Sequence, residues 1–353
     1  MIEEEVLTSW LLEKGYPAFR AEQIFSWIYQ KGVKDWYSMT NLSQSLREEL
    51  AQQFALFSLK EVRRLISQDD ETEKFLWELG DGNLVESVLI HAPERKTVCI
   101  SSQVGCGARC AFCASGRQGL MRNLSAHEIV EQVLHIDTEL KKKGERVTHI
   151  VFMGMGEPLD NYEEVTRAIR FFTDPKRFHF SPRRITVSTV GVIPAILRLA
   201  AEDLKVNLVL SLHAPNQHLR KKLIPYARKY ELSEILAAMR YYSQKTGRDT
   251  TYEYTLIEGI NDGENTAREL ADLLKKEQCT VNLIPYNPIA GLKLKRPQKE
   301  VIEAFKNILM EAHIPTTQRY TKGKDIAAAC GQLALAKKEE LLSIHKQLEK
   351  SGI

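Results

Sequence analysis

The chain of 353 residues lacks the features that mark membrane, secreted and strongly charged proteins. No apolar run approaches the roughly 18 residues that a membrane-spanning helix needs. The first residues, Met-Ile-Glu-Glu-Glu, are acidic where a secretory signal peptide would be basic. An excess of one charge is also missing, because 49 Lys and Arg nearly balance 46 Asp and Glu. We therefore expect a globular cytoplasmic protein without a membrane partner, whose net charge of +3 permits a nucleic-acid partner but does not require one.

Cysteine is scarce, but three of the six cysteines fall within eight positions, in the pattern C-x3-C-x2-C formed by Cys106, Cys110 and Cys113. A chain of this length needs no disulfides, so the cluster favours metal binding or catalysis. Structural zinc sites and ferredoxin-type clusters use four protein ligands, and no fourth Cys or His follows at a suitable spacing. Three cysteines would leave one iron of a [4Fe–4S] cluster open to another ligand. With an aromatic residue before the last cysteine, the pattern resembles the signature of radical S-adenosylmethionine (SAM) enzymes, and a zinc knuckle is the simpler alternative.

Hydrophobic periodicity divides the chain into four segments. Residues 1–60 have helical spacing and form an N-terminal accessory domain, which is either RNA-contacting or a cap with a solvated basic face. Residues 61–91 alternate as in a β extension, with a hairpin signal at Asp81-Gly82. Residues 92–320 form the core, and residues 321–353 form a C-terminal segment that carries Cys330 and a terminal helix. The alanines around Cys330, taken alone, indicate helix packing.

The core segment alternates strand-like and helix-like stretches, which predicts an α/β fold with a parallel sheet. The strand-like runs are 97–101, 149–153, 184–188, 206–212, 252–257 and 281–285. The first helix begins with the capping-box pattern Ser125-Ala-His-Glu128. Six units are too few for a closed eight-fold barrel, so we expect an open, partial (βα)6 barrel.

Gly, Ser, His and Asn residues follow the strand-like runs, where parallel α/β folds place their chemistry. Glycines at 154 and 156 would let the backbone approach a ligand, and Glu157 could accept a hydrogen bond from the amino group of SAM. Ser188, Ser211, His213 and Asn287 could bind a carboxylate, a ribose or an adenine edge. The simpler interpretation is that these are turn residues, which also gather at strand ends.

The chain resembles the RlmN/Cfr family of radical SAM RNA methyltransferases over nearly its whole length. The matching segments are 19–29, 39–42, 99–106, 153–158, 211–215, 282–288 and 325–333. The resemblance implies a radical SAM barrel, a [4Fe–4S] cluster held by the three clustered cysteines, and two SAM molecules per turnover. It places the SAM contacts at Gly156, Glu157, Ser188, Ser211, Leu212, His213 and Asn287.

The resemblance also implies a mechanism. Cys330 would take a methyl group from one SAM, and a radical made from a second SAM would remove hydrogen from that methyl group. The resulting carbon radical would add to an adenine ring carbon. Cys99 would then attack the sulfur of Cys330, release the methylated base and leave a transient disulfide. Glu86 would be the proton acceptor. Cys279 has no such role and is interpreted as a small buried residue.

Two activities remain open within the family: RlmN-type methylation of adenine carbon 2 in 23S rRNA and tRNA, and Cfr-type methylation of carbon 8 in 23S rRNA. Val104 and the segments 211–214 and 284–287 resemble RlmN, whereas 171–175 and 181–184 look more like Cfr. The segment 226–230 departs from both. We favour carbon 2, with 23S rRNA and tRNA as partners and flavodoxin or ferredoxin as the electron donor.

Two other classes of protein also fit part of the sequence. A radical SAM enzyme that activates another protein would share the cluster but would not need Cys330. A zinc-stabilised RNA-binding protein would use the three clustered cysteines without cleaving SAM. If RNA is the substrate, we expect Arg20, Lys31, Arg63 and Arg64 to contact phosphate.

Overall fold

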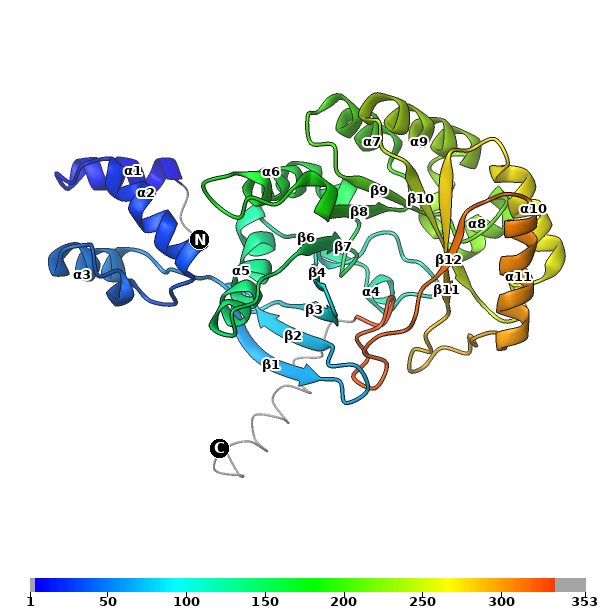
Figure 1. The fold of residues 1–353 in the computed structure, drawn as a ribbon, viewed down its shortest axis with the longest axis horizontal. Coiled ribbons are helices and arrows are strands. Elements are labelled where there is room, and N and C mark those ends of the chain that lie inside the picture. The colour runs from blue at the N-terminus through cyan, green and yellow to red at the C-terminus, as the bar shows by residue number, and fades with distance from the viewer. Residues whose placement is uncertain (1–3, 334–353) are drawn as a thin grey trace.

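The computed structural model describes residues 4–333 (Figure 1). Most of the predicted terminal helix of segment 321–353 lies outside the described residues. Residues 321–333, which we call the Cys330 loop, form turns and irregular backbone. The helix-packing interpretation of Cys330 is therefore wrong. The glycines at 323 and 331 both have positive φ, which ends any helix on either side of the alanines.

Ten strands form one continuous sheet in the order β1-β2-β3-β4-β7-β8-β9-β10-β11-β12. Neighbours from β4 to β12 are parallel, whereas β1, β2, β3 and β4 pair antiparallel. The strands are β1 (Lys60–Ile66), β2 (Glu73–Glu78), β3 (Leu84–Ala92), β4 (Arg95–Cys99), β7 (His149–Phe152), β8 (Ile185–Thr189), β9 (Asn207–Ser211), β10 (Thr250–Leu256), β11 (Cys279–Pro285) and β12 (Thr316–Gln318). The six predicted core strands and the predicted β extension are confirmed. The parallel part gains β12, which is too short to show a pattern in the sequence.

Helices connect the parallel strands and cover the outer face of the sheet (Figure 1). They are α5 (Ala126–Lys142), α6 (Tyr162–Thr173), α7 (Ile193–Ala201), α8 (Gln217–Leu223), α9 (Leu232–Thr246), α10 (Glu264–Leu274) and α11 (Lys299–Glu311), with short 3-10 helices η3 (Pro158–Asn161), η4 (Pro182–Arg184) and η5 (Pro225–Arg228). The capping box at the start of α5 is confirmed, with Ser125 Oγ accepting from Glu128 N and the Glu128 carboxylate accepting from Ser125 N.

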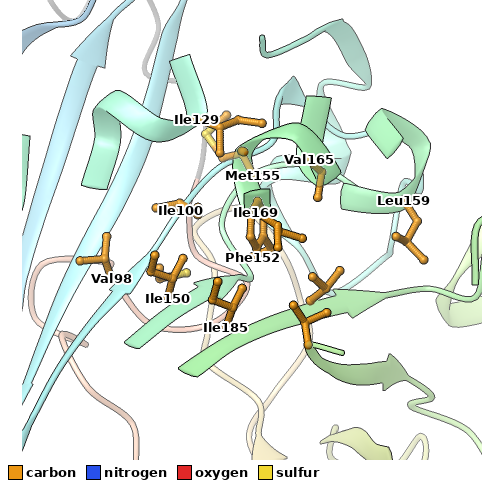
Figure 2. Close-up of a cluster of buried hydrophobic side chains, with 14 of the residues drawn as sticks. Val98, Ile100, Ile129, Ile150, Phe152, Met155, Leu159, Val165, Ile169 and Ile185 are labelled. Carbon is orange, nitrogen blue, oxygen red and sulfur yellow. The ribbon is translucent and has the colours of Figure 1, made fainter. Parts of the chain in front are cut away.

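The two faces of the parallel strands differ in chemistry because side chains alternate along each strand. The outer face is apolar: Val98, Ile150 and Ile185 pack against Ile129 of α5 and Ile169 of α6 (Figure 2). On the inner face, Cys99 pairs with Val151, which pairs with Thr186. These inner residues line a cavity, so the polar members of the alternating pattern mark the functional face.

The N-terminal helices lie beside the barrel, next to α5 and α6 (Figure 1). They are α1 (Glu4–Glu13), α2 (Phe19–Phe25), the π-helix η1 (Ser26–Lys31), the 3-10 helix η2 (Trp36–Ser38) and α3 (Gln44–Gln53). Tyr29 of η1 packs edge-on against Phe178, with 5.4 Å between ring centroids. An ion pair of 2.6 Å joins Lys176 to Glu22. The helical character predicted for the N-terminal segment is thus confirmed, and the helices dock on the barrel through aromatic and charged contacts.

A separate two-stranded sheet frames the clustered cysteines. It consists of β5 (Gln103–Gly105) and β6 (Leu120–Asn123), and the short helix α4 (Ala114–Arg117) lies between them in the chain. Gly105 has φ +77°, and a Cβ atom there would lie 2.0 Å from the carbonyl oxygen of Gly119. A residue with a side chain cannot occupy this crossing, so the glycine fixes the base of the cysteine loop.

Candidate active site in the barrel

Two adjoining cavities occupy the inner face of the sheet. The larger, of about 570 Å³, extends from Cys113 past Cys99 to Arg95 and His149. The smaller, of about 130 Å³, is lined by the three clustered cysteines and by residues at the carboxyl ends of β7 to β11. The two share several lining residues, among them Cys113, Met153, Glu253, Asn287 and Cys330. The smaller cavity therefore lies at the strand ends where parallel folds gather their chemistry.

The loop from Cys106 to Cys113 is held by backbone hydrogen bonds to three separate segments. Cys106 N donates to Gly119 O at 3.0 Å, Ala111 N to Leu223 O at 2.9 Å, and Ala114 N to Gly331 O at 2.8 Å. The last bond joins the cysteine loop to the Cys330 loop. Two segments more than 200 residues apart in the sequence are thus fixed to each other at the cavity wall.

The chemistry of the three thiols is compatible with an iron–sulfur cluster. Burial raises the pKa of all three thiols, to about 12 for Cys106, so in the iron-free chain their ionised forms are disfavoured without a cation. Among residues 4–333, no group of three His, Cys, Asp or Glu side chains is arranged to hold one metal ion. A [4Fe–4S] cluster accepts more widely spaced thiolates, because each thiolate binds its own iron.

Ser188, Ser211 and His213 line the smaller cavity together. The two serine hydroxyls lie 3.2 Å apart. His213 Nδ1 accepts a hydrogen bond of 2.9 Å from Thr255 N, so the imidazole proton is assigned to Nε2. Burial lowers the pKa of His213 to about 3, with the nearby guanidinium of Arg220 acting in the same direction. The ring is therefore neutral at working pH and can donate one hydrogen bond.

Glu157 also lines the smaller cavity, but its carboxylate holds the protein backbone. Oε1 accepts from Leu159 N at 3.0 Å, and Oε2 accepts from Val190 N at 2.8 Å. Burial raises the pKa of Glu157 to about 7. A hydrogen bond from Thr189 also reaches the carboxylate, so a bound amino group would have to share an oxygen with these donors.

The glycines before Glu157 serve the packing of the chain. A Cβ atom at Gly154 would lie 2.6 Å from Ile100 O, and one at Gly156 would lie 2.8 Å from Gln103 N. Gly156 also lines the smaller cavity, with φ +110°. The two glycines therefore let the loop after β7 cross the segment after β4 at close range. The sequence analysis assigned them to the approach of a ligand and did not predict this packing role.

Leu212 and Asn287 are engaged with the protein itself. The Leu212 side chain is buried, its N–H donates to Glu253 O at 3.0 Å, and its carbonyl accepts from Arg220 Nε at 3.2 Å. Asn287 lines both cavities, donates from Nδ2 to Cys330 O at 3.1 Å, and accepts from Thr321 Oγ1 at 3.1 Å. Asn287 thus connects the smaller cavity with the Cys330 loop.

Cys99 and Glu86 lie on neighbouring strands at the same face of the sheet. Cys99 is buried at the end of β4, pairs with Val88 of β3, and lines the larger cavity. Burial raises the pKa of its thiol to about 12. Glu86 is buried two residues before Val88, and its Oε1 lies 3.0 Å from Lys74 Nζ. Lys74 also donates to Ala327 O at 3.2 Å, so this ion pair reaches the Cys330 loop.

Cys330 lines both cavities and is exposed to them. Arg319 Nη1 lies 3.4 Å from its Sγ and 3.0 Å from Glu253 Oε1. The surrounding protein raises the pKa of the Cys330 thiol, and the guanidinium of Arg319 opposes that rise.

Comparisons with known proteins agree over most of the chain. A model described as the radical SAM superfamily matches residues 100–272, and one described as the ribosomal RNA large subunit methyltransferase N-terminal domain matches residues 2–56. The chain is 62% identical over 337 residues to "Probable dual-specificity RNA methyltransferase RlmN 2" of Protochlamydia amoebophila, covering 96% of this chain and 94% of the relative. The chain belongs to the RlmN family of radical SAM methyltransferases.

Further matches give this RlmN family member the same overall length and fold as its relatives. "Probable dual-specificity RNA methyltransferase RlmN" of Symbiobacterium thermophilum is 48% identical, covering 93% of this chain and 89% of the relative. The crystal structure of a radical SAM methyltransferase from Sphaerobacter thermophilus matches with a TM-score of 0.91 and 46% identity, covering 94% and 97% of the two chains. Members of the radical SAM superfamily use SAM and a [4Fe–4S] cluster, so family membership supports both cofactors in general terms. Within residues 4–333, no helix has the length and apolar character needed to cross a membrane.

Sequence reasoning missed three charged residues of the candidate site: Glu253, Arg319 and Arg220. The signal for Glu253 was a lone acidic residue inside an otherwise uncharged run, Thr250–Leu256. Arg220 is fully buried and donates to Val190 O at 2.7 Å and Ser211 O at 3.0 Å, tying the ends of β8 and β9. Arg220 and Arg319 had no local signal, because their partners come from distant strands.

The basic residues expected to contact RNA differ in availability. Lys31 and Arg63 are exposed, and Lys31 Nζ lies 3.5 Å from the centroid of the Trp27 ring. Arg20 donates to Gln23 Oε1 at 2.7 Å, and Arg64 pairs with Glu61 at 2.7 Å. Lys31 and Arg63 are therefore the better candidates for phosphate contacts.

Proposed function

We propose that this chain methylates carbon 2 of an adenosine in 23S rRNA and of the adenosine 3′ of the anticodon in tRNA. The observation that carries the proposal is the position of Cys330. Cys330 lines both cavities, whereas Cys99 lines only the larger one and Cys106 and Cys110 line only the smaller one. A methyl carrier must meet its methyl donor on one side and its acceptor on the other, and this side chain has access to both.

The residues divide the work between the two cavities. Cys106, Cys110 and Cys113 would hold the [4Fe–4S] cluster, and Gly156, Glu157, Ser188, Ser211, Leu212, His213 and Asn287 would surround SAM. When bound, these cofactors supply first a methyl group for Cys330 and then, from a second SAM, the radical chemistry that an electron-poor adenine carbon requires. Cys330 keeps the carbon near the larger cavity, where an adenine splayed out of its RNA would enter.

Release of the product is assigned to Cys99 and Glu86. Glu86 would accept the proton from the adenine carbon, and its Oε1 lies 3.0 Å from Lys74 Nζ. The one electron that must leave the adduct when this proton departs would be taken up by the bound cluster. The Cys99 thiolate would then attack the Cys330 sulfur and form a disulfide, while the bond between that sulfur and the CH2 carbon breaks, and the carbon keeps the electron pair and takes a proton to become the methyl group of the base. Cys99 lines the larger cavity, and Glu86 lies on the same face of the neighbouring strand, which supports this order of events.

Carbon 2 is favoured over carbon 8 because the relatives are named RlmN and dual-specificity RNA methyltransferases. The same names support RNA as the substrate, and 23S rRNA and tRNA are proposed as the two partners from the family resemblance. We further propose residues 1–60 as the RNA-contacting domain, 61–91 as the β extension, 92–320 as the catalytic core and 321–353 as the carrier segment. The protein would work in the cytoplasm with flavodoxin or ferredoxin as reductant.

The identity of the methylated nucleoside tests the proposal. Reconstituted protein, SAM and a reductant are incubated anaerobically with unmodified 23S rRNA fragments or tRNA, and nucleosides are identified by mass spectrometry. We expect 2-methyladenosine from both RNAs, at least 100-fold less with Cys330→Ala, and a covalent protein–RNA adduct with Cys99→Ala. Cys279→Ala, which changes a buried cysteine outside both cavities, should retain wild-type yield.

Other products would contradict specific parts of the proposal. 8-Methyladenosine would show that the methylated position is wrong, and its formation in rRNA alone would remove tRNA as a substrate. A zinc-containing, iron-free protein that does not cleave SAM would overturn the enzymatic assignment. SAM cleavage unaffected by Cys330→Ala, without any methylated RNA, would point to an activating enzyme instead.

A further inference from the structure

Arg319 is held in front of Cys330 by strands of the barrel. It follows β12 directly, and its backbone N–H donates to Leu283 O of β11 at 2.9 Å. Its Nη1 reaches Glu253 Oε1 of β10 at 3.0 Å and Cys330 Sγ at 3.4 Å. The guanidinium is therefore fixed from the rigid sheet, while the thiol that it contacts lies on a loop.

The groups that act on the Cys330 thiol come from several elements. Glu253 and Arg319 belong to the sheet region, Cys113 belongs to the cysteine loop, and Cys99 ends β4. Lys322, on the Cys330 loop itself, also lines the larger cavity. Among these named groups, Arg319 is the cation contributed by another element. It is also the one that contacts the sulfur directly.

The chemistry assigned to Cys330 needs such a contact. A thiol accepts a methyl group only after its proton has left, here to solvent, because the thiolate is the nucleophile. The sulfur electron pair then forms the new S–CH3 bond, the S–CH3 bond of SAM breaks, and its electron pair stays on the departing S-adenosylhomocysteine. Until that transfer, a negative charge must be stabilised on a sulfur that faces the two cavities.

We propose that Arg319 is a catalytic residue of the methyl-acceptor step, donating a hydrogen bond to the Cys330 thiolate, and that Glu253 is the positioning residue that holds its guanidinium. This inference rests on the proposed function of Cys330. An arginine suits the task because its planar fork can serve two acceptors at once, whereas lysine is a flexible point charge. After methylation the sulfur is neutral, so the contact weakens at the stage when the methyl group must react further.

The test measures the reactivity of Cys330 in protein that is loaded with its cluster but given no SAM. Protein carrying Cys99→Ala is produced under iron limitation, the mass of the Cys330 peptide confirms that it is unmethylated, and the cluster is reconstituted anaerobically. The rate of Cys330 alkylation by iodoacetamide is followed by peptide mass spectrometry from pH 6 to 10.5. The pH midpoint of this rate reports ionisation of Cys330 itself.

Substitution of either partner of the Arg319–Glu253 ion pair should shift the pH midpoint of Cys330 alkylation, in opposite directions for the two partners. Arg319→Met should raise it by about one pH unit, because the stabilising cation is lost. Glu253→Gln should lower it, since the amide oxygen can still hold Nη1 while the neighbouring negative charge is removed. Arg296→Met is the matched control: Arg296 donates to Thr321 of the same loop at 2.9 Å without contacting Cys330, so its midpoint should not move.

Several outcomes would overturn the inference. An unchanged midpoint in Arg319→Met, or a shift in the same direction in Arg319→Met and Glu253→Gln, would show that Arg319 merely supports the loop. If Arg319→Met does not fold, Glu253→Gln and Arg319→Lys decide, and a wild-type midpoint in both would count against the proposal.

A second measurement separates this inference from the proposed function. With SAM but without reductant or RNA, the Cys330 peptide should gain one methyl group about ten-fold more slowly in Arg319→Met at pH 7.5. Equal rates in the two proteins would refute the role of Arg319 while leaving the methyl carrier intact. A wild-type protein that never gains the methyl group would instead refute the proposed function, whatever the alkylation midpoints show.

Discussion

Two buried carboxylates that line the smaller cavity affect both ligand binding and the stability of the fold. Glu157 and Glu253 are both less than one-tenth exposed, and burial raises the pKa of each. Glu253 has a cation beside it, whereas Glu157 has backbone N–H groups. Glu157 is therefore close to its protonation midpoint near neutral pH, and it should affect stability in a pH-dependent way.

We expect the iron-free protein to lose stability as pH rises from about 5 to about 7, because of Glu157. In this range the unfolded chain carries an ionised carboxylate, near its ordinary value of 4.5, while the folded chain keeps it protonated up to about 7. Unfolding then releases a proton, so the free energy of unfolding should fall by up to about 3 kcal/mol across the range.

Urea unfolding of wild-type and Glu157→Gln protein at several pH values measures this contribution as the difference between their pH slopes. Gln cannot ionise, so the slope of the variant should be shallower whatever its absolute stability. Parallel slopes for the two proteins would mean that Glu157 is ionised throughout the range in the folded chain.

At the scale of elements, the Cys330 loop is held to the β1–β2 hairpin by hydrogen bonds that involve side chains of both segments. Asp325 accepts from Ser67 Oγ at 2.7 Å and from Gln68 N at 3.0 Å, and Asp70 accepts from Gly323 N at 2.8 Å. These bonds are few and lie near the surface, so this docking should open more easily than the barrel.

Asp325→Ala should loosen the Cys330 loop without unfolding the protein. We expect amide hydrogen exchange in residues 321–333 to accelerate about five-fold to ten-fold, since two hydrogen bonds are lost, while the melting temperature changes little. Asp249→Ala removes a comparable surface contact, to Gln278 at 2.9 Å, and serves as the control. If exchange in the loop is the same in both variants, Asp325 does not hold it.

The elements differ in how far the sequence could predict them. The six core strands were predictable because each is an apolar or alternating run followed by a polar turn, and the capping box at Ser125 is a local pattern. β12 was not, because three residues give no periodicity. The docking of the Cys330 loop depends on Ser67 and Asp70, which lie more than 250 positions away in the sequence, and no local pattern links them.

The same distinction holds for the candidate site. The cysteine loop was predictable because its three residues are close in the sequence, and the strand-end residues because parallel strands end at one edge. The contacts of Cys330 with Arg319 and of Arg319 with Glu253 were not, because they join a loop to two strands. Residues that are close in the sequence can be assigned to a site from their spacing. Pairs of charges from distant segments can be identified only once the fold is known.

At the scale of the whole molecule, the exposed basic residues Lys31 and Arg63 should contribute to RNA affinity through phosphate contacts. We expect Lys31→Ala/Arg63→Ala to weaken tRNA binding and to lower the slope of log affinity against log salt by up to about two. The measurement is a salt series of binding isotherms with the reconstituted protein.

The control for this prediction keeps the net charge change the same. Lys245→Ala/Lys276→Ala removes two exposed lysines of the barrel periphery, near the ends of α9 and α10. A slope that falls equally in both double variants would show that the effect is one of overall charge, and that the N-terminal helices do not form the contact surface.

The sheet has two end strands, β1 and β12, and the Cys330 loop runs from one toward the hairpin that contains the other (Figure 1). The open side of the barrel is thus closed by a seam without a strand, held by side chains rather than by a β ladder. Because Cys330 lies on this seam, any motion that parts it also moves the Cys330 sulfur. Opening of the barrel interior and movement of the Cys330 sulfur are therefore coupled. A large folded RNA that forces the seam apart would also change the position of Cys330 before its next reaction.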